Sequence, residues 1–478
     1  MKLIEKYKRI PLALKASLWY IICSVMQKAI AFVTTPIFTR LMSTEQYGEV
    51  TLYNSWLEVF TIFATLNLFY GVYNNILAKY PQEKDTATSS MQGLTTTITI
   101  GFFVVYLLFQ NYINGFTGMN TSTTVLLFLE VLFIPAYRFW LTNQRFEYKY
   151  KYVIIATLVI AVLTPILGVP AVILSTEKGM AKIISNVIAQ LVIAIYLYFY
   201  IFVKGKKFYD KKFWKYALVF NLPLVPHYLS STVLNQSDRI MISKICGKSE
   251  AGIYGLAYTI GILIIFIVTA INNSFTPWIY KRFKSQKYDD IGNKSEMVTL
   301  CVAVFTIMLV AVAPEMMWIL GGKRYTDGVW IVAPIAISVF FRFLYNLYSN
   351  IEFYYEENYF IMIASVLCAI INIVLNYIFI KMLGFLAAGY TTLFCYALYA
   401  LAHSIFAKYV AQKHIGTTQV FNDKNILIQS IVVTFVSFAI MSLYSMPVVR
   451  YTILCIIIII MIYFRNKIVS IIKQIRGN

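Results

Sequence analysis

The chain has 478 residues, of which 59% are hydrophobic and only 13% are charged. Soluble domains carry roughly a quarter charged residues, so this composition excludes a soluble enzyme, a disordered chain and a small disulfide scaffold. It predicts an all-α polytopic membrane protein. The 41 Lys and Arg residues exceed the 21 Asp and Glu residues, which gives a formal net charge of +20. In so apolar a chain, we attribute this excess to membrane topology and expect no nucleic-acid partner.

Apolar runs of about 20 residues, the length that crosses the hydrocarbon core, recur along the whole chain. We predict fourteen transmembrane helices, near residues 13–37, 49–76, 91–112, 122–142, 151–173, 181–203, 214–235, 252–276, 296–320, 329–351, 359–381, 384–408, 425–445 and 448–464. We expect the first run to be a retained span and not a cleaved signal peptide. The connections are short, so no soluble domain of ordinary size fits between the spans.

An even number of spans places both termini on the same side of the membrane. With the N-terminus inside, 28 basic residues fall in inside segments and ten in outside segments, Lys178 and Lys182 among the latter. This bias predicts cytoplasmic termini. One inside loop, 352–358, does not follow the rule, because it carries three glutamates and no basic residue.

The basic stretch 204–213 lies near the middle of the chain, and we take it as a linker between two halves. An internal repeat supports this division. Pro36–Met42, at the end of the first span, is followed by Glu45–Gly48, and Asn235–Met241, at the end of the seventh, is followed by Glu250–Gly255. Both copies contain Arg, an apolar residue and Met, and then Glu, Tyr and Gly at the start of the next span.

Ionisable groups in the hydrocarbon core cost at least about 2.5–3.5 kcal/mol each, so they tend to face a water-filled interior. The predicted spans contain, or end at, Lys28, Arg40, Glu58, Glu130, Arg138, Asp238, Arg239 and Arg342. For Lys28 and Arg342, deep in their runs, we favour a cavity over a buried ion pair. Arg138 fits equally well with an ion pair to Glu130, two helical turns away. Arg40 and Arg239 fit equally well as interfacial anchors.

No GxxxxGK[ST] loop for ATP occurs, and six scattered cysteines and three histidines offer no metal-ligand spacing. We therefore expect no cofactor and an ion gradient as the energy source. The candidates for binding Na⁺ or H⁺ are Glu58, Glu130, Asp238, Asn372 and Asn376. The two asparagines share one helix face, and hydrogen bonding between helices is the alternative explanation for them.

At Pro36–Gly48 and Ser237–Tyr254 the sequence resembles the Wzx-type polysaccharide and O-antigen flippases of the multidrug/oligosaccharidyl-lipid/polysaccharide exporter (MOP) superfamily. The resemblance extends to the length, the number of spans and the basic middle loop. It implies two pseudo-symmetric six-helix lobes around a central cavity, followed by two further helices. The corresponding divisions are a lobe at 1–203, a cytoplasmic linker at 204–213, a lobe at 214–410, and two extra transmembrane helices with a tail at 411–478.

The resemblance also implies a transporter and not an enzyme, located in the bacterial inner membrane. Its substrate would be an undecaprenyl-diphosphate-linked oligosaccharide, moved from the cytoplasmic to the periplasmic face by ion-coupled alternating access. The product would enter O-antigen, lipopolysaccharide or capsule synthesis, with membrane lipids, a polysaccharide polymerase and a chain-length regulator as partners. Since a diphosphate is anionic, we expect it to be bound by cavity cations, namely Lys28, Arg40, Arg138, Arg239 and Arg342.

Three alternatives stay open at this point. A drug or cation antiporter of the same superfamily shares the fold but favours an acidic cavity, whereas here the spans hold at least as much base as acid. A lipid II flippase would use the same mechanism on another lipid diphosphate. A membrane polysaccharide polymerase usually needs a long external loop or a catalytic acid–base constellation, and the sequence shows neither.

Overall fold

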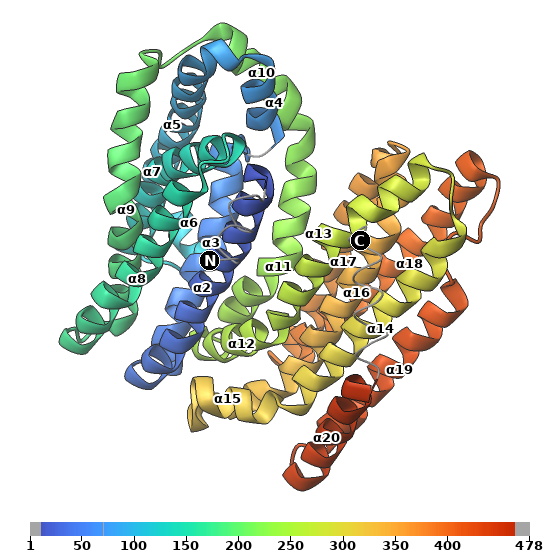
Figure 1. Ribbon diagram of the computed structural model, residues 1–478. Helices are drawn as coiled ribbons and strands as arrows, with labels where there is room; N and C mark the ends of the chain where they lie inside the picture. Colours follow the sequence, from blue (N-terminus) through green and yellow to red (C-terminus); the bar gives the residue numbers. More distant parts are fainter. Residues whose placement is uncertain (1–10, 70, 464–478) are drawn as a thin grey trace, which may run out of the picture. The chain divides into compact units, whose positions relative to one another are not determined.

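The computed structural model describes residues 11–69 and 71–463, apart from the side chains of 289 and 358. Across these residues the chain forms helices and turns and contains no strand (Figure 1). The predicted all-α polytopic fold is confirmed.

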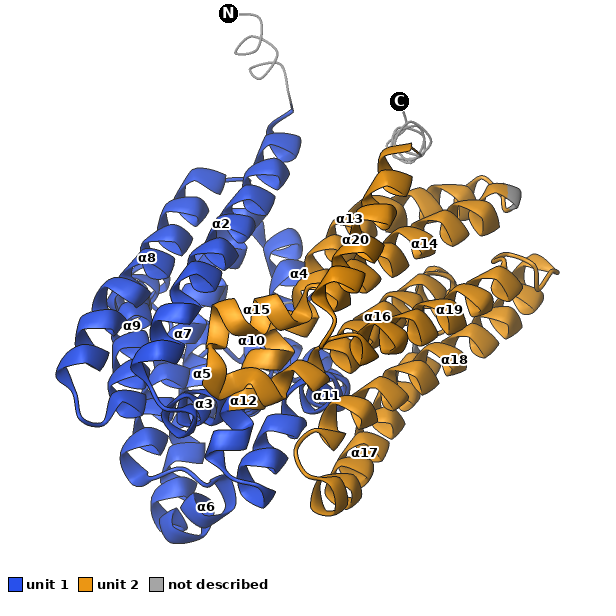
Figure 2. Ribbon diagram, turned by 90° about the horizontal axis from the view of Figure 1, so that it is seen from below, with its two compact units in different colours: residues 1–252 blue, residues 253–478 orange. Residues whose placement is uncertain are grey.

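Contacts within the chain divide it into two compact units, Met1–Gly252 and Ile253–Asn478 (Figure 2). Helix α11 (Val225–Ile245), which follows the basic stretch 204–213, belongs to unit 1 because it packs along α3 (Thr44–Thr65). The lobes expected at 1–203 and 214–410, and the central cavity between them, stay predictions.

Unit 1 is built mainly from long helices with two short ones inserted. Its helices are α2 (Leu12–Leu41), α3, α4 (Gly71–Lys79), α5 (Lys84–Leu108), α6 (Gln110–Thr117), α7 (Thr121–Phe146), α8 (Tyr150–Leu174), α9 (Lys178–Gly205), α10 (Lys211–Asn221), α11 (Val225–Ile245) and the beginning of α12 (Lys248–Gly261). Helix α9 packs against α7 and α8, and α2 packs against α8. These contacts bring α2, α3, α7, α8 and α9 around one region of the unit.

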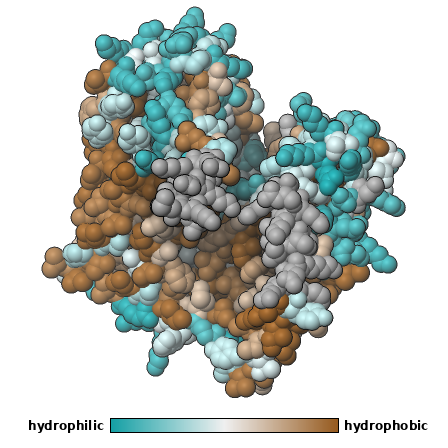
Figure 3. Space-filling view, viewed as in Figure 1, coloured by the Kyte–Doolittle hydropathy of each residue, from teal (hydrophilic) through white to brown (hydrophobic). Residues whose placement is uncertain are grey.

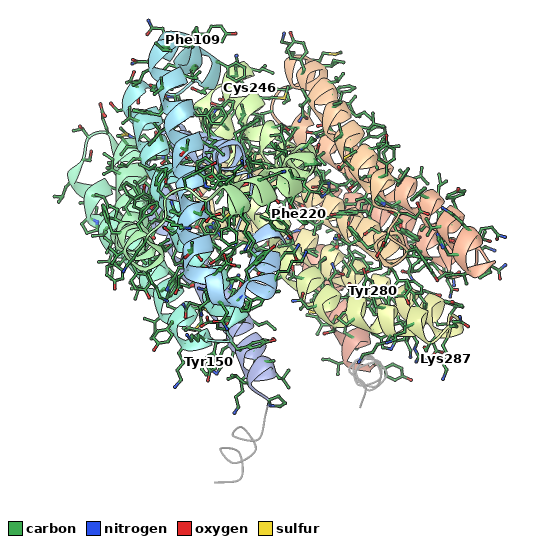
Figure 4. All side chains as sticks on the ribbon, turned by 90° about the horizontal axis from the view of Figure 1, so that it is seen from above. Phe109, Tyr150, Phe220, Cys246, Tyr280 and Lys287 are labelled. Atoms are coloured by element: carbon green, nitrogen blue, oxygen red, sulfur yellow. The ribbon has the colours of Figure 1, made fainter. Side chains whose placement is uncertain are left out.

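Local sequence signals explain where several of these helices begin and end. The Ser43 hydroxyl accepts from the Gln46 amide (3.1 Å) and the Gln46 side chain accepts from the Ser43 amide (3.0 Å), a capping box that starts α3. Leu66 and Asn67 adopt positive φ values of 48° and 51°, which ends α3 before α4 begins. Between α10 and α11, Pro223 lies in a short 3₁₀ turn, Leu222–Leu224, which interrupts the helix of the predicted seventh span. Figure 4 labels Phe220, just before this turn, and Cys246, just after α11.

Unit 2 surrounds one central helix. Its helices are the rest of α12, α13 (Ile265–Lys284), α14 (Asp289–Ala311), α15 (Ala313–Gly321), α16 (Val329–Tyr354), α17 (Asn358–Leu383), α18 (Ala387–Ile415), α19 (Asp423–Ser442) and α20 (Pro447–Tyr463). Helix α16 packs against α18, α14, α13 and α19. Most of its side chains are buried for this reason, and it forms the centre of the largest apolar core of the unit.

Twelve helical segments of the described chain are long and apolar enough to cross a membrane. They match the predicted runs except for the second and the last. The second falls on α3 and α4, which are separated at Leu66, and the last falls on α20, which is 17 residues long. The total of fourteen spans therefore stays a prediction.

The surface of unit 1 has the polarity of a membrane protein. Figure 3 shows hydrophobic residues along the flank on which α9 lies and hydrophilic residues at one end of the unit. On α9, Val192, Tyr196, Phe199 and Val203 are between 57% and 74% exposed and follow helical spacing. Large apolar side chains that lie outward in such a row are suited to contact with lipid.

A cluster of ion pairs joins several helix ends of unit 1. Lys84 pairs with Glu147, Lys204 with Asp85 (3.1 Å) and Lys212 with Glu83 (2.8 Å), so the start of α5, the ends of α7 and α9 and the start of α10 gather there. The basic linker contributes to this cluster. Its residue Phe208 packs so closely on α5 that a Cβ at Gly93 would lie 1.9 Å from the Phe208 carbonyl oxygen.

Aromatic and basic residues also lie near helix ends in both units. At the start of α8, Tyr150 stacks on Trp19 of α2 with 6.5 Å between ring centroids, and Lys287 lies in the turn between α13 and α14 (Figure 4). Aromatic and basic residues at helix ends are typical of membrane–water interfaces.

Candidate functional site

Unit 1 contains a polar cavity of about 450 Å³ among α2, α3, α7, α8 and α9. Its polar lining comes from all five helices and consists of Gln27, Thr34, Thr35, Tyr47, Thr51, Tyr53, Asn54, Glu130, Thr164, Lys182, Asn186 and Gln190. A volume of this size is in the range of small-molecule sites. So many hydrogen-bonding groups in a membrane span indicate a hydrated chamber and not a packed core.

Prolines and a glycine shape the walls of the cavity. Pro36 lies inside α2 and Pro165 and Pro170 lie inside α8, where a proline removes a backbone hydrogen bond and bends the helix. A Cβ at Gly168 would lie 3.1 Å from the Lys182 ammonium and 3.0 Å from the Phe38 ring. The missing side chain at Gly168 thus makes room for the lysine.

Glu130 of α7 is 1% exposed, and both of its carboxylate oxygens accept from neutral donors. The Tyr53 hydroxyl donates to Oε2 at 2.6 Å, and the Gln190 amide donates to Oε1 at 2.7 Å. The ion pair with Arg138 that the sequence left open does not form. A carboxylate held only by neutral groups can bind a cation or a proton without breaking an ion pair.

Lys182 of α9 is only 8% exposed, and its ammonium lies 3.5 Å from the centroid of the Phe38 ring. Within the described residues it makes no hydrogen bond and no ion pair. The positive-inside pattern predicts Lys182 in an outside segment, which is wrong because α9 already begins at Lys178. The missed signal is its spacing to Asn186 and Gln190, since residues four apart form one polar stripe on a helix.

A second network joins α3 to α11 near the cavity. Arg239 is 9% exposed and donates to the Asn235 carbonyl (2.7 Å) and to Gln236 Oε1 (2.6 Å). Gln236 in turn donates to Glu58 Oε2 at 2.6 Å. The positive charge of Arg239 also lies close enough to interact electrostatically with the hydroxyl of Tyr47, which lines the cavity. The structure therefore brings the predicted residues Glu58 and Arg239 together, with the fully buried Asp238 beside them on α11.

The two copies of the sequence repeat contact each other inside unit 1. A Cβ at Gly48 would lie 1.7 Å from the Lys248 carbonyl oxygen, and one at Gly252 would lie 2.3 Å from the Thr44 carbonyl oxygen. The hydroxyls of Thr44 and Ser249 are hydrogen-bonded at 2.7 Å. The repeat glycines thus allow close packing between α3 and α12.

The other predicted cations of unit 1 lie outside the cavity lining. Lys28 is exposed on α2, next to the lining residue Gln27, and Arg138 is exposed on α7. Arg40 is exposed and donates to the Pro36 carbonyl at 3.0 Å. Their role in binding an anion stays a prediction.

In unit 2, Arg342 is partly buried on α16 and is surrounded by phenols. It is hydrogen-bonded to the Tyr345 hydroxyl, and Tyr258 of α12 and Tyr396 of α18 lie close to it. A guanidinium with neutral neighbours of this kind can exchange a phenol for a stronger anionic partner.

Asn372 and Asn376 of α17 are fully buried. The Asn376 amide donates to Asn372 Oδ1 at 3.2 Å, and the Thr391 hydroxyl of α18 donates to Asn376 Oδ1. Hydrogen bonding between helices, the alternative from the sequence, is therefore present. A role of these residues in ion binding stays a prediction.

The sequence analysis missed an ionisable pair in unit 2. Glu352 was assigned to an inside loop, which is wrong because α16 continues to Tyr354 and its packing buries Glu352 completely. His403 of α18 faces it, with Nδ1 2.9 Å from each carboxylate oxygen. The apolar run ends just before Glu352, so sequence alone gave no sign that the helix continues.

Comparison with known proteins places the chain in a family. Residues 13–283, more than half of the chain, match the family described as "Polysaccharide biosynthesis protein". The chain belongs to this polysaccharide biosynthesis family. Residues 223–378 also match the MatE family. Protein 1 of the Lsg locus of Haemophilus influenzae is 22% identical over 379 residues, which cover 75% of this chain and 89% of that protein.

Solved structures show which fold this family member has. The lipid II flippase MurJ in an inward closed conformation has a TM-score of 0.67 at 16% identity and covers 94% of this chain and 99% of its own. An inward-facing multidrug resistance MATE family transporter of the MOP superfamily has a TM-score of 0.63 at 13% identity, with 81% and 96% covered. The resemblance seen in the sequence is confirmed in family and fold: the chain is a multi-span membrane protein of the polysaccharide biosynthesis family and has the fold of the MOP superfamily transporters.

Proposed function

We propose that this transporter is a flippase for an undecaprenyl-diphosphate-linked oligosaccharide. It moves the lipid-linked sugar from the cytoplasmic to the periplasmic face of the bacterial inner membrane by ion-coupled alternating access, with both termini in the cytoplasm. The sugar then enters a surface polysaccharide such as O-antigen or capsule, where a polymerase and a chain-length regulator are the partners. The observation that carries the proposal is Lys182, a buried ammonium without an acidic partner in the polar cavity of a polysaccharide-family transporter.

The charge of Lys182 fits an anionic group of the substrate. A diphosphate that enters a span loses hydration, and a fixed cation offsets that loss far better in a low-dielectric site than in water. The ammonium now rests on the Phe38 ring at 3.5 Å. A phosphate oxygen is a stronger partner than an aromatic face, so the lysine can exchange one for the other.

The remaining lining suits a sugar. Gln27, Asn54, Asn186 and Gln190 supply amide donors and acceptors, and Tyr47 supplies an aromatic surface with a hydroxyl. A cavity of about 450 Å³ has room for a diphosphate and the first sugar but not for a long lipid. We therefore place the isoprenoid chain outside the cavity, in the bilayer.

Glu130 binds the coupling ion in this mechanism. Its negative charge in the same cavity opposes an anionic substrate unless a cation neutralises it. A proton or Na⁺ on Glu130 would thus favour the binding of the diphosphate, and loss of the ion would favour release. The neutral donors Tyr53 and Gln190 hold the carboxylate in place in both states.

The test is flipping by the purified chain in vesicles. The probe is undecaprenyl-diphosphate-linked oligosaccharide with a fluorescent sugar, and its appearance on the far leaflet is read by chemical quenching. We expect the wild type to flip the probe, Lys182→Ala to lose flipping and Lys182→Arg to retain part of it. The matched control is Lys211→Ala, which removes an exposed lysine and should have no effect. Full flipping by Lys182→Ala, or none by the wild type, would reject the proposal.

A second candidate is a lipid II flippase. The MurJ structure favours it, since it covers nearly the whole chain. Fluorescent lipid II in the same vesicles distinguishes the two functions, because both lipids carry the diphosphate and differ only in the sugar and peptide. Faster flipping of lipid II than of the oligosaccharide lipid would select the second candidate.

A further inference from the structure

The buried pair Glu352–His403 lies entirely in unit 2 and outside the cavity described above. Both side chains are 0% exposed, and His403 Nδ1 lies 2.9 Å from both Glu352 oxygens. The other ring nitrogen of His403, Nε2, is buried and has no hydrogen-bond partner among the described residues. A buried polar atom without a hydrogen-bond partner costs free energy. We therefore expect a function that explains why His403 Nε2 is buried in this way.

The geometry limits the pair to a few proton states. The short contacts require a hydrogen on Nδ1 or on the carboxylate. With Nδ1–H and an ionised Glu352, the pair carries one negative charge and Nε2 keeps a free lone pair. One additional proton, on Nε2 or on the carboxylate, makes the pair neutral overall. Because a net charge buried inside a membrane span is strongly disfavoured, the pair gains from taking up that proton.

Aromatic rings enclose the imidazole. Tyr399 of α18, Tyr345 of α16 and Phe360 of α17 lie 4.6, 5.5 and 5.6 Å from His403 between ring centroids. Tyr345 is also hydrogen-bonded to Arg342. The rings thus connect the pair to the guanidinium without placing a positive charge against Glu352.

Other titratable groups on the neighbouring helices are engaged elsewhere. From α19, Asp423 accepts from Tyr348 (3.0 Å) and pairs with Lys408 (3.3 Å). From α14, Glu296 accepts from two asparagines at 3.0 and 2.9 Å. Cys368 of α17 donates to the Cys395 carbonyl, and Tyr280 of α13 packs on Tyr354 at 5.5 Å between ring centroids. Because these groups have partners elsewhere, His403 is the titratable group that contacts Glu352.

We propose that Glu352 and His403 form a proton-binding site that takes up one proton in each transport cycle. The ligand is a proton and not Na⁺, since Na⁺ needs several oxygen ligands and both Glu352 oxygens here face an imidazole nitrogen. Proton uptake removes the negative charge of the pair and so changes the field at Arg342, about ten residues away on the same helix. The proton site stands by itself, whereas its link to lipid transport rests on the proposed function.

Proton binding is tested on the purified full-length chain in lipid nanodiscs by infrared difference spectra between acidic and alkaline pH. Among the bands that change with pH, we expect one set from the Glu352 carboxyl group and the His403 imidazole, which Glu352→Gln removes and whose midpoint pH is shifted by His403→Gln. The matched control is Glu357→Gln, which changes a partly exposed carboxylate that pairs with Lys413 and should leave these bands unchanged. Spectra of Glu352→Gln identical to the wild type would overturn the proton site. If Glu352→Gln does not fold, an unchanged midpoint in His403→Gln would do so.

Coupling is tested in vesicles with the fluorescent lipid and imposed pH or Na⁺ gradients. We expect flipping by the wild type to respond to the pH gradient, and Glu352→Gln to flip with a clearly smaller response to it, since Glu130 is still present. A wild type that flips with no pH response, or a Glu352→Gln variant that keeps the full response, overturns the coupling while the proposed function stands. A wild type that flips nothing rejects the proposed function, and the infrared result still decides on the proton site.

Discussion

The ionisable residues in the interiors of the two units have different kinds of partner. In unit 1, Glu130 and Lys182 line one hydrated cavity, and neither forms an ion pair in the described chain. In unit 2, the buried Glu352 is in direct contact with the His403 imidazole, and the buried Arg450 pairs with Glu315, which is 31% exposed. Free charges beside water suit the binding of a passing ligand, whereas enclosed pairs suit structural support or the storage of a proton.

The largest effect is expected from Arg450 of unit 2. It is 2% exposed, donates to the Ala311 carbonyl (2.6 Å) and holds Glu315 with two bonds of 2.9 and 2.8 Å. Arg450→Ala removes the two bonds to Glu315 and the bond to the Ala311 carbonyl, while Glu315, which is 31% exposed, keeps its bond from Tyr451; we therefore expect a loss of about 1.5–3 kcal/mol in stability. Thermal unfolding in detergent measures it, with Arg324→Ala, an exposed arginine, as the control. Equal melting temperatures would show that the pair gives unit 2 no support.

The same pair predicts the pH dependence of this contribution. Burial raises the pKa of Glu315, but the hydrogen bonds from Arg450 and Tyr451 outweigh burial and leave the pKa below its usual value of 4.5. A lowered pKa means that the stabilisation is present above the unfolded-state pKa and is lost as the pH falls through the folded-state pKa. We therefore expect Glu315→Gln to be less stable than the wild type at neutral pH and to lose less stability on acidification. A parallel acid dependence of both proteins would contradict this assignment.

A smaller loss of stability is expected from Gly48 in unit 1. The Cβ of alanine would meet the Lys248 backbone at 1.7 Å, and backbone cannot move aside as a side chain can. Gly48→Ala should therefore cost about 1–3 kcal/mol. Gly101→Ala is the control, because nothing lies within 4 Å of that Cβ and alanine favours a helix. If both variants melt at the same temperature, the close packing of the repeat copies is not important for unit 1.

Glu130→Gln tests the coupling role of the unit 1 cavity. Glutamine retains the size and most hydrogen bonds but removes the charge that holds an ion. Hydrogen bonds to charged groups are worth about 1.5–3 kcal/mol, so we expect gradient-driven flipping to fall about tenfold or more. Melting temperature checks the fold, and Glu45→Gln, which changes an exposed glutamate of the same unit, is the control. Undiminished response to the gradient would remove Glu130 from the mechanism.

The smallest effect is expected from Arg138→Ala. The side chain is exposed and lies outside the cavity lining, and exposed charges contribute about 0–1 kcal/mol. Flipping should therefore stay within about fivefold of the wild type in the vesicle assay. A complete loss would show that Arg138 contacts the substrate in a conformation of the transporter other than the one described.

The sequence predicted those features that depend on local pattern. Apolar runs located the long helices, and the Ser43–Gln46 capping box and the proline at 223 are signals that a reader can find in the printed sequence. The matching repeat copies, which prove to touch at Gly48 and Gly252, were visible for the same reason.

Several residues of the candidate sites could not be predicted from the hydropathy of the spans. Lys182 was missed because it lies at the very start of the predicted run 181–203 and was counted with the outside segment, although α9 already begins at Lys178. Glu352 was missed because α16 continues past its apolar run, and its partner His403 is 51 residues away in the chain. Conversely, Lys28 and Arg138 fall within apolar runs but lie exposed, because hydropathy does not tell which side of a helix faces the interior.

The account depends most on whether the ammonium of Lys182 binds the diphosphate. The direct measurement is the affinity of the purified chain in nanodiscs for undecaprenyl-diphosphate-linked oligosaccharide, compared among the wild type, Lys182→Ala and Lys182→Arg. Since a bond to a charged group is worth about 1.5–3 kcal/mol, the account predicts that Lys182→Ala raises the Kd roughly 10- to 100-fold and that Lys182→Arg stays near the wild type. Equal Kd values for the wild type and Lys182→Ala would contradict it.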